Sequence, residues 1–220
     1  MEKIAVLTSG GDGPGLNACI RAVTRQALQN DVVVYGVRWG YRGLVNGEIS
    51  ALESRDVGGI MAKGGTFLGT ARCPEFKDIQ VRRTALRHLN QHDIEGLIVI
   101  GGNGSLTGAL KLHEMGFPTM GIPASIDNDI DGTDMAVGVD TTLNTILDAI
   151  DRVKDTASSH QRAFLIEVMG RNCGYLALAS GLAGGAEMIL VPECEGPSME
   201  KIAETVVDAY VRGKHHCIMA

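Results

Sequence analysis

The sequence predicts an α/β fold built from doubly wound, mainly parallel sheets with helices on both faces. Short apolar runs rich in β-branched residues alternate with segments of helical period, and the connections between them are short. Several of these runs are followed at once by clusters of glycine. The chain has 220 residues, of which 45% are hydrophobic and 21% charged, so it is long and apolar enough to bury a core.

The expected elements alternate along the chain. Runs of strand length occupy residues 4–8, 31–37, 96–100, 117–122, 163–168, 188–191 and 216–220. Helical periods cover about 16–29, 78–90, 106–114, 140–156, 173–183 and 198–211. Residues 40–70 are expected to be irregular, with short helical pieces. Since the last strand-like run has no helix after it, we expect a fragment whose second domain is incomplete.

Charge and composition exclude several classes of function. The formal net charge is −6 and there is no block of lysine and arginine, so we expect no nucleic-acid partner. No apolar run approaches the roughly 18 residues of a membrane span, and no signal peptide follows Met1. The five cysteines are scattered without CxxC spacing. We therefore expect a reduced, cytoplasmic protein without structural zinc or membrane contact.

The first glycine cluster, residues 10–17, joins a strand to a helix. Backbone N–H groups and a helix N-terminus can hold a phosphate at such a turn. The cluster lacks the GK[ST] ending of a P-loop. Gly13, Gly15 and Ala18 match the dinucleotide fingerprint GxGxx(G/A), but the next strand ends in residues 36–38 without the acidic residue expected at the ribose. Hydride transfer is therefore disfavoured, and a purely structural turn stays as the alternative.

Two further strand ends carry polar clusters. Residues 101–105 repeat the glycine-rich turn, which indicates one nucleotide spanning both turns. Residues 123–131 form a loop rich in Asp, whose carboxylates can accept a proton from a substrate hydroxyl or help to hold a metal. A solvated turn rich in Asp and Asn is the alternative for this loop.

Arginines occupy the remaining strand-end loops. Arg171, flanked by glycine in residues 167–174, is well placed for bidentate phosphate recognition. Arg72 and Arg162 lie in similar loops. In a chain of negative net charge, this placement indicates local capture of small polyanions, although each arginine taken alone could be an ordinary surface residue.

Taken in order, these motifs resemble those of the bacterial, ATP-dependent 6-phosphofructokinase family over the whole chain. The family's LTSGGDxPGxN is similar to residues 7–17, and its GGTxLGxAR is similar to residues 64–72. Its TIDND resembles residues 125–129, and its SSHxR and EVMGRxxG match residues 158–162 and 167–174. Five motifs in the same order make chance similarity negligible.

The resemblance implies phosphoryl transfer from ATP to the 1-hydroxyl of fructose 6-phosphate in glycolysis, with Mg²⁺ as cofactor. It implies that Asp127 accepts the hydroxyl proton and that Arg72 stabilises the transferring group, with Ser125 and Arg171 completing the catalytic set. The implied ATP-binding residues are Gly11, Tyr41, Arg72, Cys73, Gly102, Asn103, Gly104 and Ser105. The implied sugar-phosphate residues are Ser125, Asp127, Asp129, Arg162, Met169, Gly170 and Arg171, with Arg162 reaching across from a neighbouring subunit.

The resemblance also implies oligomerisation and regulation. We expect a homotetramer with ADP or phosphoenolpyruvate as effectors. The implied effector residues are Arg21, Arg25, Arg55, Lys154, Gly185, Glu187, Lys214 and His215. A solvated helix face is the alternative for the first two. We expect a nucleotide-binding domain over residues 1–137 and the start of a sugar-phosphate and effector domain over residues 138–220.

Three positions depart from the family's motifs. Asn103 replaces the aspartate that helps to bind magnesium, and an amide oxygen can coordinate a hard cation but brings no charge. We therefore expect weakened activity. Ser125 replaces threonine and keeps the hydroxyl group. Ala124, together with Gly104, favours ATP over pyrophosphate as the phosphoryl donor.

Two alternatives to this function stay open. One is a kinase of another acceptor, since NAD kinase-like enzymes share a GGDG-type turn. The other is a catalytically impaired subunit that binds nucleotide and sugar phosphate and regulates an active partner, which the amide at Asn103 and the early end of the chain favour.

Overall fold

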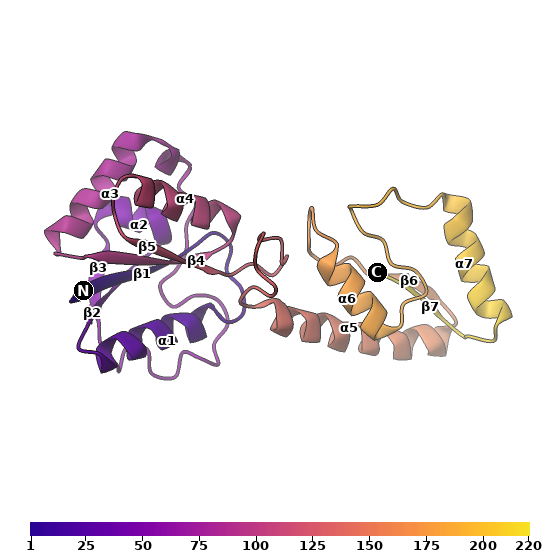
Figure 1. Ribbon diagram of the computed structural model, residues 1–220. Helices are drawn as coiled ribbons and strands as arrows, with labels where there is room; N and C mark the ends of the chain where they lie inside the picture. Colours follow the sequence, from indigo (N-terminus) through magenta and orange to yellow (C-terminus); the bar gives the residue numbers. More distant parts are fainter. The chain divides into compact units, whose positions relative to one another are not determined.

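The computed structural model describes residues 1–220 and divides into two compact units (Figure 1). The first unit comprises Met1–Ser125 with Ala136–Gly138, and the second comprises Ile126–Met135 with Val139–Ala220. The first holds a five-stranded sheet and the second a two-stranded sheet. The assignment of nucleotide binding and sugar-phosphate binding to the two parts of the chain stays a prediction.

The sheet of the first unit is wound in both directions from its first strand. Its order is β3-β2-β1-β4-β5. The strands are β1 (Lys3–Ser9), β2 (Val33–Val37), β3 (Ile49–Leu52), β4 (Gly96–Gly101) and β5 (Thr119–Pro123). All pairs are parallel except β2 with the edge strand β3. Because the chain leaves β1 toward β2 and later returns to β4 on its other side, the carboxyl ends of β1 and β4 form a topological switch point.

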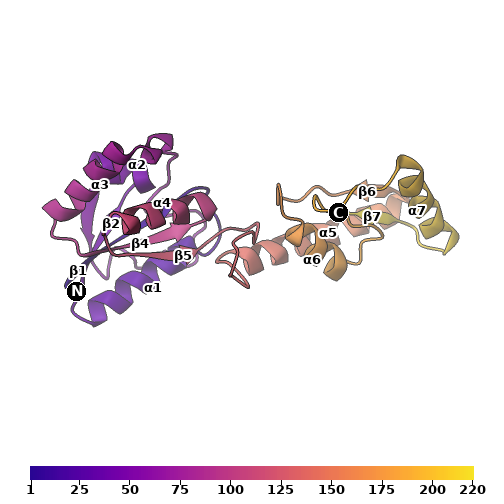
Figure 2. The same cartoon turned by 45° about the horizontal axis from the view of Figure 1, so that its top comes forward.

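Helices cover both faces of this sheet, as predicted (Figures 1 and 2). Helix α1 (Leu16–Gln29) lies on one face; on the other lie α2 (Gly40–Asn46), α3 (Ile79–Gln91), α4 (Asn103–Glu114) and the 3₁₀ turn η1 (Pro74–Lys77). Side chains alternate along β1 accordingly: Ile4 and Val6 join the core beside α1, whereas Ala5 and Leu7 join the core on the other face.

The second unit has the same layering on a smaller scale. It contains α5 (Val139–His160), β6 (Ala163–Leu165), α6 (Tyr175–Gly184), α7 (Met199–Val211) and β7 (Cys217–Met219), with β6 and β7 parallel. On β7, Ile218 packs with Ile150 and Ala157 of α5, while Cys217 and Met219 pack with Ala209 of α7. Helices therefore cover both faces of this sheet too.

Three expectations about the elements need correction. Residues 49–52 form β3 inside the segment expected to be irregular. The run 188–191 is not a strand: it makes a single bridge from Met188 to Met219. Leu190 N–H donates a hydrogen bond to the Ala220 carbonyl oxygen, and Ala220 N–H donates one to the Met188 carbonyl oxygen, so the run is attached beside β7 without forming a strand of its own. Strand β6 is shorter than the expected 163–168. None of the helices has the length and apolar composition needed to cross a bilayer.

Candidate active site

The two glycine-rich turns lie side by side at the switch point of the first unit. Ser9 at the end of β1 pairs in register with Gly101 at the end of β4. A Cβ at Gly101 would lie 2.5 Å from the Ser9 carbonyl oxygen, and a Cβ at Gly10 would lie 3.4 Å from Ser105 Oγ. Glycine at position 101 therefore permits the close approach of the two strand ends. Together the turns form one edge from which ligands are bound in folds of this kind.

Each turn leads into a helix whose first turn contains no acidic side chain. Helix α1 is capped by Gly15 and α4 by Gly102, and neither helix has a side-chain cap or an acidic residue in its first turn. Helix α4 begins at Asn103, earlier than expected, so Gly104 and Ser105 belong to its first turn. A Cβ at Gly104 would meet nothing within 4 Å, so the end of α4 is open to a ligand. Such paired N-termini suit phosphate groups.

The loop 64–72 approaches the same edge of the sheet. Thr70 Oγ1 donates a hydrogen bond to the Gly10 carbonyl oxygen at 2.6 Å. Arg72, two residues further on, is exposed, so its guanidinium is available to an anionic ligand. Cys73 is half-buried, and burial raises the pKa of its thiol, which keeps it neutral.

Tyr41 stabilises the first turn of α4 through a hydrogen bond. Its ring stacks on Phe76 with centroids 4.1 Å apart, and its hydroxyl donates a hydrogen bond to the Ser105 carbonyl oxygen at 2.6 Å. Only 5% of Tyr41 is exposed, and burial raises the pKa of its phenol, which stays a neutral donor. A contact between Tyr41 and ATP stays a prediction, whereas the hydrogen bond from Tyr41 to Ser105 is present in the structure.

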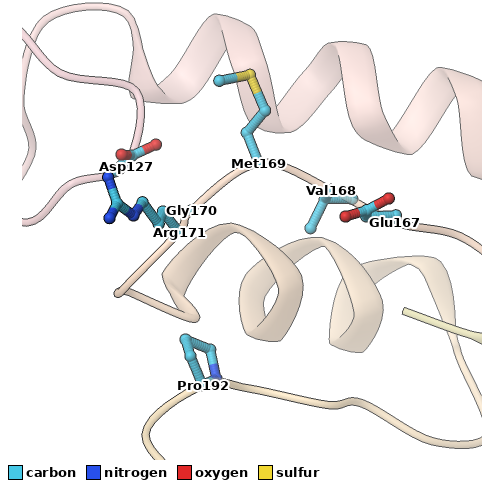
Figure 3. Close-up of a pocket in the computed structure, with 7 residues that line it drawn as sticks. All are labelled: Asp127, Glu167, Val168, Met169, Gly170, Arg171 and Pro192. Atoms are coloured by element: carbon cyan, nitrogen blue, oxygen red, sulfur yellow. The ribbon is translucent and has the colours of Figure 1, made fainter.

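The second unit contains a pocket of about 650 Å³, which we call the Asp127 pocket. Its lining residues are Asp127, Glu167, Val168, Met169, Gly170, Arg171 and Pro192 (Figure 3). Four of the expected sugar-phosphate residues (Asp127, Met169, Gly170 and Arg171) are thus brought together from two separate segments. In Figure 3 the Arg171 side chain extends toward the Asp127 carboxylate. A cationic group and an acceptor line the same pocket.

Asp127 has the environment of a proton acceptor. Its Oδ1 is buried and has no hydrogen-bond partner, so it can accept a proton from a ligand hydroxyl. Burial raises the pKa of this carboxyl, and the neighbouring charge of Asp129 raises it further. A carboxylate with a raised pKa is a stronger base.

The backbone around Arg171 is fixed by glycine and by a residue that the sequence did not single out. Gly170 has φ +118°, and a Cβ there would collide with the Cys173 carbonyl oxygen, so this turn requires glycine. Glu193 Oε1 accepts a hydrogen bond from the Gly174 N–H at 2.8 Å. Glu193 and Pro192 follow the apolar run 188–191, so the strand-end rule that identified Arg171 could have identified them as well.

The expected effector residues of the second unit include one tight pair. Glu187 forms an ion pair with Lys214 and accepts the Ile218 N–H at 2.6 Å. Burial opposes ionisation of Glu187, but the Lys214 ammonium and the Ile218 N–H outweigh it, so the pKa of Glu187 is lowered. Lys154 is paired instead with Asp151 at 3.3 Å.

The other expected effector and subunit-contact residues are placed as follows. Gly185 caps α6 with φ +67°. The exposed residues are Arg25, Arg55, Arg162 and His215, while Arg21 is half-buried. These placements leave an effector role and a subunit contact as predictions.

The donor atoms of the chain favour a metal carried by a ligand over a closed metal centre. No group of three or more His, Cys, Asp or Glu side chains is arranged to hold a metal ion. Asn103 offers a neutral amide oxygen on the exposed first turn of α4. Mg²⁺ commonly keeps its waters and is held by one or two protein oxygens plus substrate phosphates, and this donor set fits that arrangement.

Comparison with known proteins gives a consistent result. A family model described as phosphofructokinase matches residues 3–220. The ATP-dependent 6-phosphofructokinase of Macrococcus caseolyticus is 57% identical over 219 residues, and that of Bacillus licheniformis is 55% identical. Each match covers 100% of this chain and 68% of the relative, so the chain spans about two thirds of these proteins' length.

Solved structures agree with this result. The phosphofructokinase of Saccharomyces cerevisiae superposes with a TM-score of 0.94 at 38% identity, covering 100% of this chain and 33% of that one. The pyrophosphate-dependent phosphofructokinase of Marinobacter aquaeolei superposes with a TM-score of 0.87 at 26% identity, covering 100% of this chain and 59% of that one. The family model, the relatives and the solved structures all match this chain along nearly its whole length. The chain therefore belongs to the phosphofructokinase family.

Proposed function

We propose that this chain transfers a phosphoryl group from ATP to the 1-hydroxyl of fructose 6-phosphate, giving fructose 1,6-bisphosphate and ADP. The observation that carries the proposal is the Asp127 pocket. An unpartnered, buried carboxylate oxygen and an arginine line the same pocket, and a sugar phosphate offers the hydroxyl and the anion that match them. The relatives named ATP-dependent 6-phosphofructokinase support the same reaction.

The proposed step needs one base and many positive groups. Asp127 accepts the proton of the sugar 1-hydroxyl, and the hydroxyl oxygen forms a bond to the γ-phosphorus of ATP. The bond from that phosphorus to the bridging oxygen breaks, and ADP leaves. Negative charge spreads over the transferred group, so neutralisation and alignment supply most of the catalysis. Arg72 and the N-termini of α1 and α4 would neutralise the ATP phosphates, and Arg171 the sugar phosphate.

The proposal includes Mg²⁺ bound with ATP. The amide oxygen of Asn103 would be its protein ligand at the end of α4. When bound, the ion would neutralise phosphate charge. Because an amide supplies no negative charge, it would hold the ion more weakly than a carboxylate in the same place.

ATP is the proposed donor in preference to pyrophosphate. Gly104 leaves open space above the end of α4, and Ala124 places no cation on the loop after β5. A larger nucleotide fits these two features. Parallel assays with ATP and with pyrophosphate test the choice: turnover with ATP alone is expected, and turnover with pyrophosphate alone would contradict it.

The test of the reaction follows labelled phosphate. The chain is mixed with γ-³²P-labelled ATP and fructose 6-phosphate, and label is expected in fructose 1,6-bisphosphate. Asp127→Asn is expected to reduce transfer about 10²- to 10⁴-fold, because it removes the base. Asp131→Asn, an exposed change in the same loop, is the matched control and should leave transfer unchanged.

Other outcomes separate the alternatives. Equal transfer by Asp127→Asn and the unaltered chain would refute the assigned base. Calorimetric binding of both ligands without transfer would establish the impaired regulatory subunit, which the amide at Asn103 favours. Binding of ATP with no binding of fructose 6-phosphate would instead point to another acceptor.

Regulation and assembly are proposals that extend this function. Glu187 and Lys214, paired in the second unit, would form part of a site for ADP or phosphoenolpyruvate. The exposed Arg162 would contact a sugar phosphate bound to a neighbouring subunit of a homotetramer. Sedimentation at several protein concentrations tests the assembly; a monomer at all of them would contradict it for this chain.

A further inference from the structure

The segment that carries Arg72 has no helix or strand to hold its shape. Residues 53–73 contain neither, yet Arg72 must be presented in a defined place if it is to contact ATP phosphates. The backbone polar groups of such a segment need partners from elsewhere. Turn hydrogen bonds within the segment supply some of them, such as Gly69 N–H to the Thr66 carbonyl oxygen, and side chains of β1 and α1 supply others between residues 63 and 69.

Asn17 makes the largest share of these contacts. It is the second residue of α1 and is only 3% exposed. Its Nδ2 donates hydrogen bonds to the carbonyl oxygens of Lys63 at 3.0 Å and Gly64 at 3.3 Å. Its Oδ1 accepts a hydrogen bond from the Phe67 N–H at 2.5 Å. Both donor positions and the acceptor of the amide are thus used on one segment.

Two threonines continue the attachment toward Arg72. Thr8, 1% exposed on β1, is hydrogen-bonded to Thr66 Oγ1 at 2.7 Å and donates to the Gly69 carbonyl oxygen at 3.1 Å. Thr70 donates to the Gly10 carbonyl oxygen on the turn after β1. The attachment therefore has contacts at six positions from residue 63 to residue 70, which lies two residues before Arg72.

We propose that Asn17, assisted by Thr8, is a positioning residue of the nucleotide site: it holds residues 63–70 against α1 and β1 and so presents Arg72 to the phosphates of ATP. This inference rests on the proposed function. No other residue type offers two donors and one acceptor on so short a side chain. Leucine fills the space without bonds, and aspartate lacks the donors that the two carbonyl groups require.

The chain carries its own probe of this segment. Trp39 is the only tryptophan, and it is 47% exposed. A Cβ at Gly69 would lie 2.8 Å from Trp39 Cε3, and the backbone N–H of Trp39 donates a hydrogen bond to the Leu68 carbonyl oxygen at 3.0 Å. Tryptophan emission and its quenching by acrylamide therefore report on residues 63–70 without any ligand.

The experiment is a double-mutant cycle on ATP affinity, measured by calorimetry. Arg72→Ala is expected to weaken ATP binding about tenfold or more, since a charge-assisted contact is lost. Asn17→Ala is expected to weaken it by a similar factor and to increase quenching of Trp39 by acrylamide. The double variant is expected to match Arg72→Ala alone, because Asn17 acts through that arginine. Asn30→Ala, at the other end of α1, is the control and should change neither readout.

The possible outcomes distinguish failure of the positioning role from failure of the proposed function. If Asn17→Ala binds ATP as the unaltered chain does while Arg72→Ala is weakened, the positioning role is wrong and the proposed function stands. Full additivity of the two losses also overturns the role. If the unaltered chain binds no ATP, the proposed function fails, and Trp39 quenching still shows whether Asn17 holds the segment. Should Asn17→Ala fail to fold, Thr8→Val, which keeps the shape of a β1 residue, is expected to give the same pattern.

Discussion

Two side chains carry most of the proposed chemistry. Asp127 is a carboxylate whose burial raises its pKa and leaves one oxygen without a partner. Asn103 is an amide where the family's motif carries a carboxylate. In the proposed reaction the first residue would serve as the base, and the second would hold the cation that accompanies ATP more weakly than a carboxylate does.

Restoring the charge at position 103 tests the second effect. Asn103→Asp is expected to raise phosphoryl transfer about 10²- to 10³-fold, the range typical for a charge-stabilising group in a catalytic site. The measurement is turnover at several Mg²⁺ concentrations, where the variant should reach its maximum at lower Mg²⁺. Asn128→Asp adds the same charge in the Asp-rich loop of the second unit and is the control. An unchanged rate in Asn103→Asp would refute the metal role.

The raised pKa of Asp127 predicts a shift in pH dependence. As the pH falls through that pKa, the base becomes protonated and transfer is lost. Asp129→Asn removes the neighbouring charge, so the pKa of Asp127 should fall and its titration should move to lower pH. Carboxyl ¹³C NMR measures this without turnover, and Asp131→Asn should cause no comparable shift. A titration that moves upward in Asp129→Asn would contradict repulsion between the two carboxylates as a cause of the raised pKa.

The same shift has a consequence for stability. Because the pKa of Asp127 is higher in the folded chain than in the unfolded one, its contribution to stability is complete below the unfolded pKa. That contribution is lost as the pH rises through the folded pKa. Above the folded pKa the ionised group therefore opposes folding. Asp127→Asn should unfold at a higher denaturant concentration than the unaltered chain at pH 7, and a lower midpoint would contradict this sign.

At the scale of elements, the site depends on how closely the ends of β1 and β4 approach. Gly101 lies between them, where a Cβ would meet the Ser9 carbonyl oxygen, whereas Gly104 faces open space. These two glycines stand three residues apart but serve different purposes. The first permits packing, and the second leaves room for a ligand.

Alanine at each position separates these purposes. Gly101→Ala is expected to destabilise the first unit by about 1–3 kcal/mol, because the added carbon forces the strand ends apart. Gly104→Ala should leave the denaturant midpoint unchanged or raise it, since alanine favours a helix, yet weaken ATP binding by occupying the open space. Denaturant titration and calorimetry give the two readouts. Equal stability of the two variants would contradict the packing role of Gly101.

The sequence predicted most of these elements because each core strand is a continuous apolar run and each turn is rich in glycine. It did not predict β3, because a short edge strand with two exposed residues carries no clear alternation. It wrongly predicted a strand at residues 188–191. The pattern of apolar residues does not show which neighbouring strand a segment pairs with, or over how many residues the two pair. Strand-end loops pointed to Arg171 and to the Asp-rich loop, and the family resemblance singled out Asp127 within that loop. Asn17 and Glu193, by contrast, act by hydrogen bonds that only folding creates.

At the scale of the whole molecule, the two units differ in how much core they bury. The first unit has two large buried clusters, one on each face of its sheet. The second has two small ones. Its exposed apolar side chains include Leu165, Leu178, Leu182, Val207 and Val211. Fewer buried contacts mean a lower free energy of local opening.

Hydrogen exchange measures this difference directly. The amides of β1 and β4 should exchange slowest, and those of β6 and β7 at least about tenfold faster, because strand pairing in the second unit is backed by less buried apolar surface. Mass spectrometry of peptides from each strand gives the rates. Equal protection of the two sheets would show that the small core is as stable as the large ones.

In the proposed function, the strand-end turns of the first unit bind the phosphates of ATP. A ¹H–¹⁵N NMR titration of the 220-residue chain with ATP, repeated with adenosine, tests it most directly. Saturable shifts are expected at the amides of Gly11, Gly104 and Ser105 with ATP, and much smaller ones with adenosine. Unshifted amides at these three positions, with the largest changes elsewhere on the chain, would contradict it.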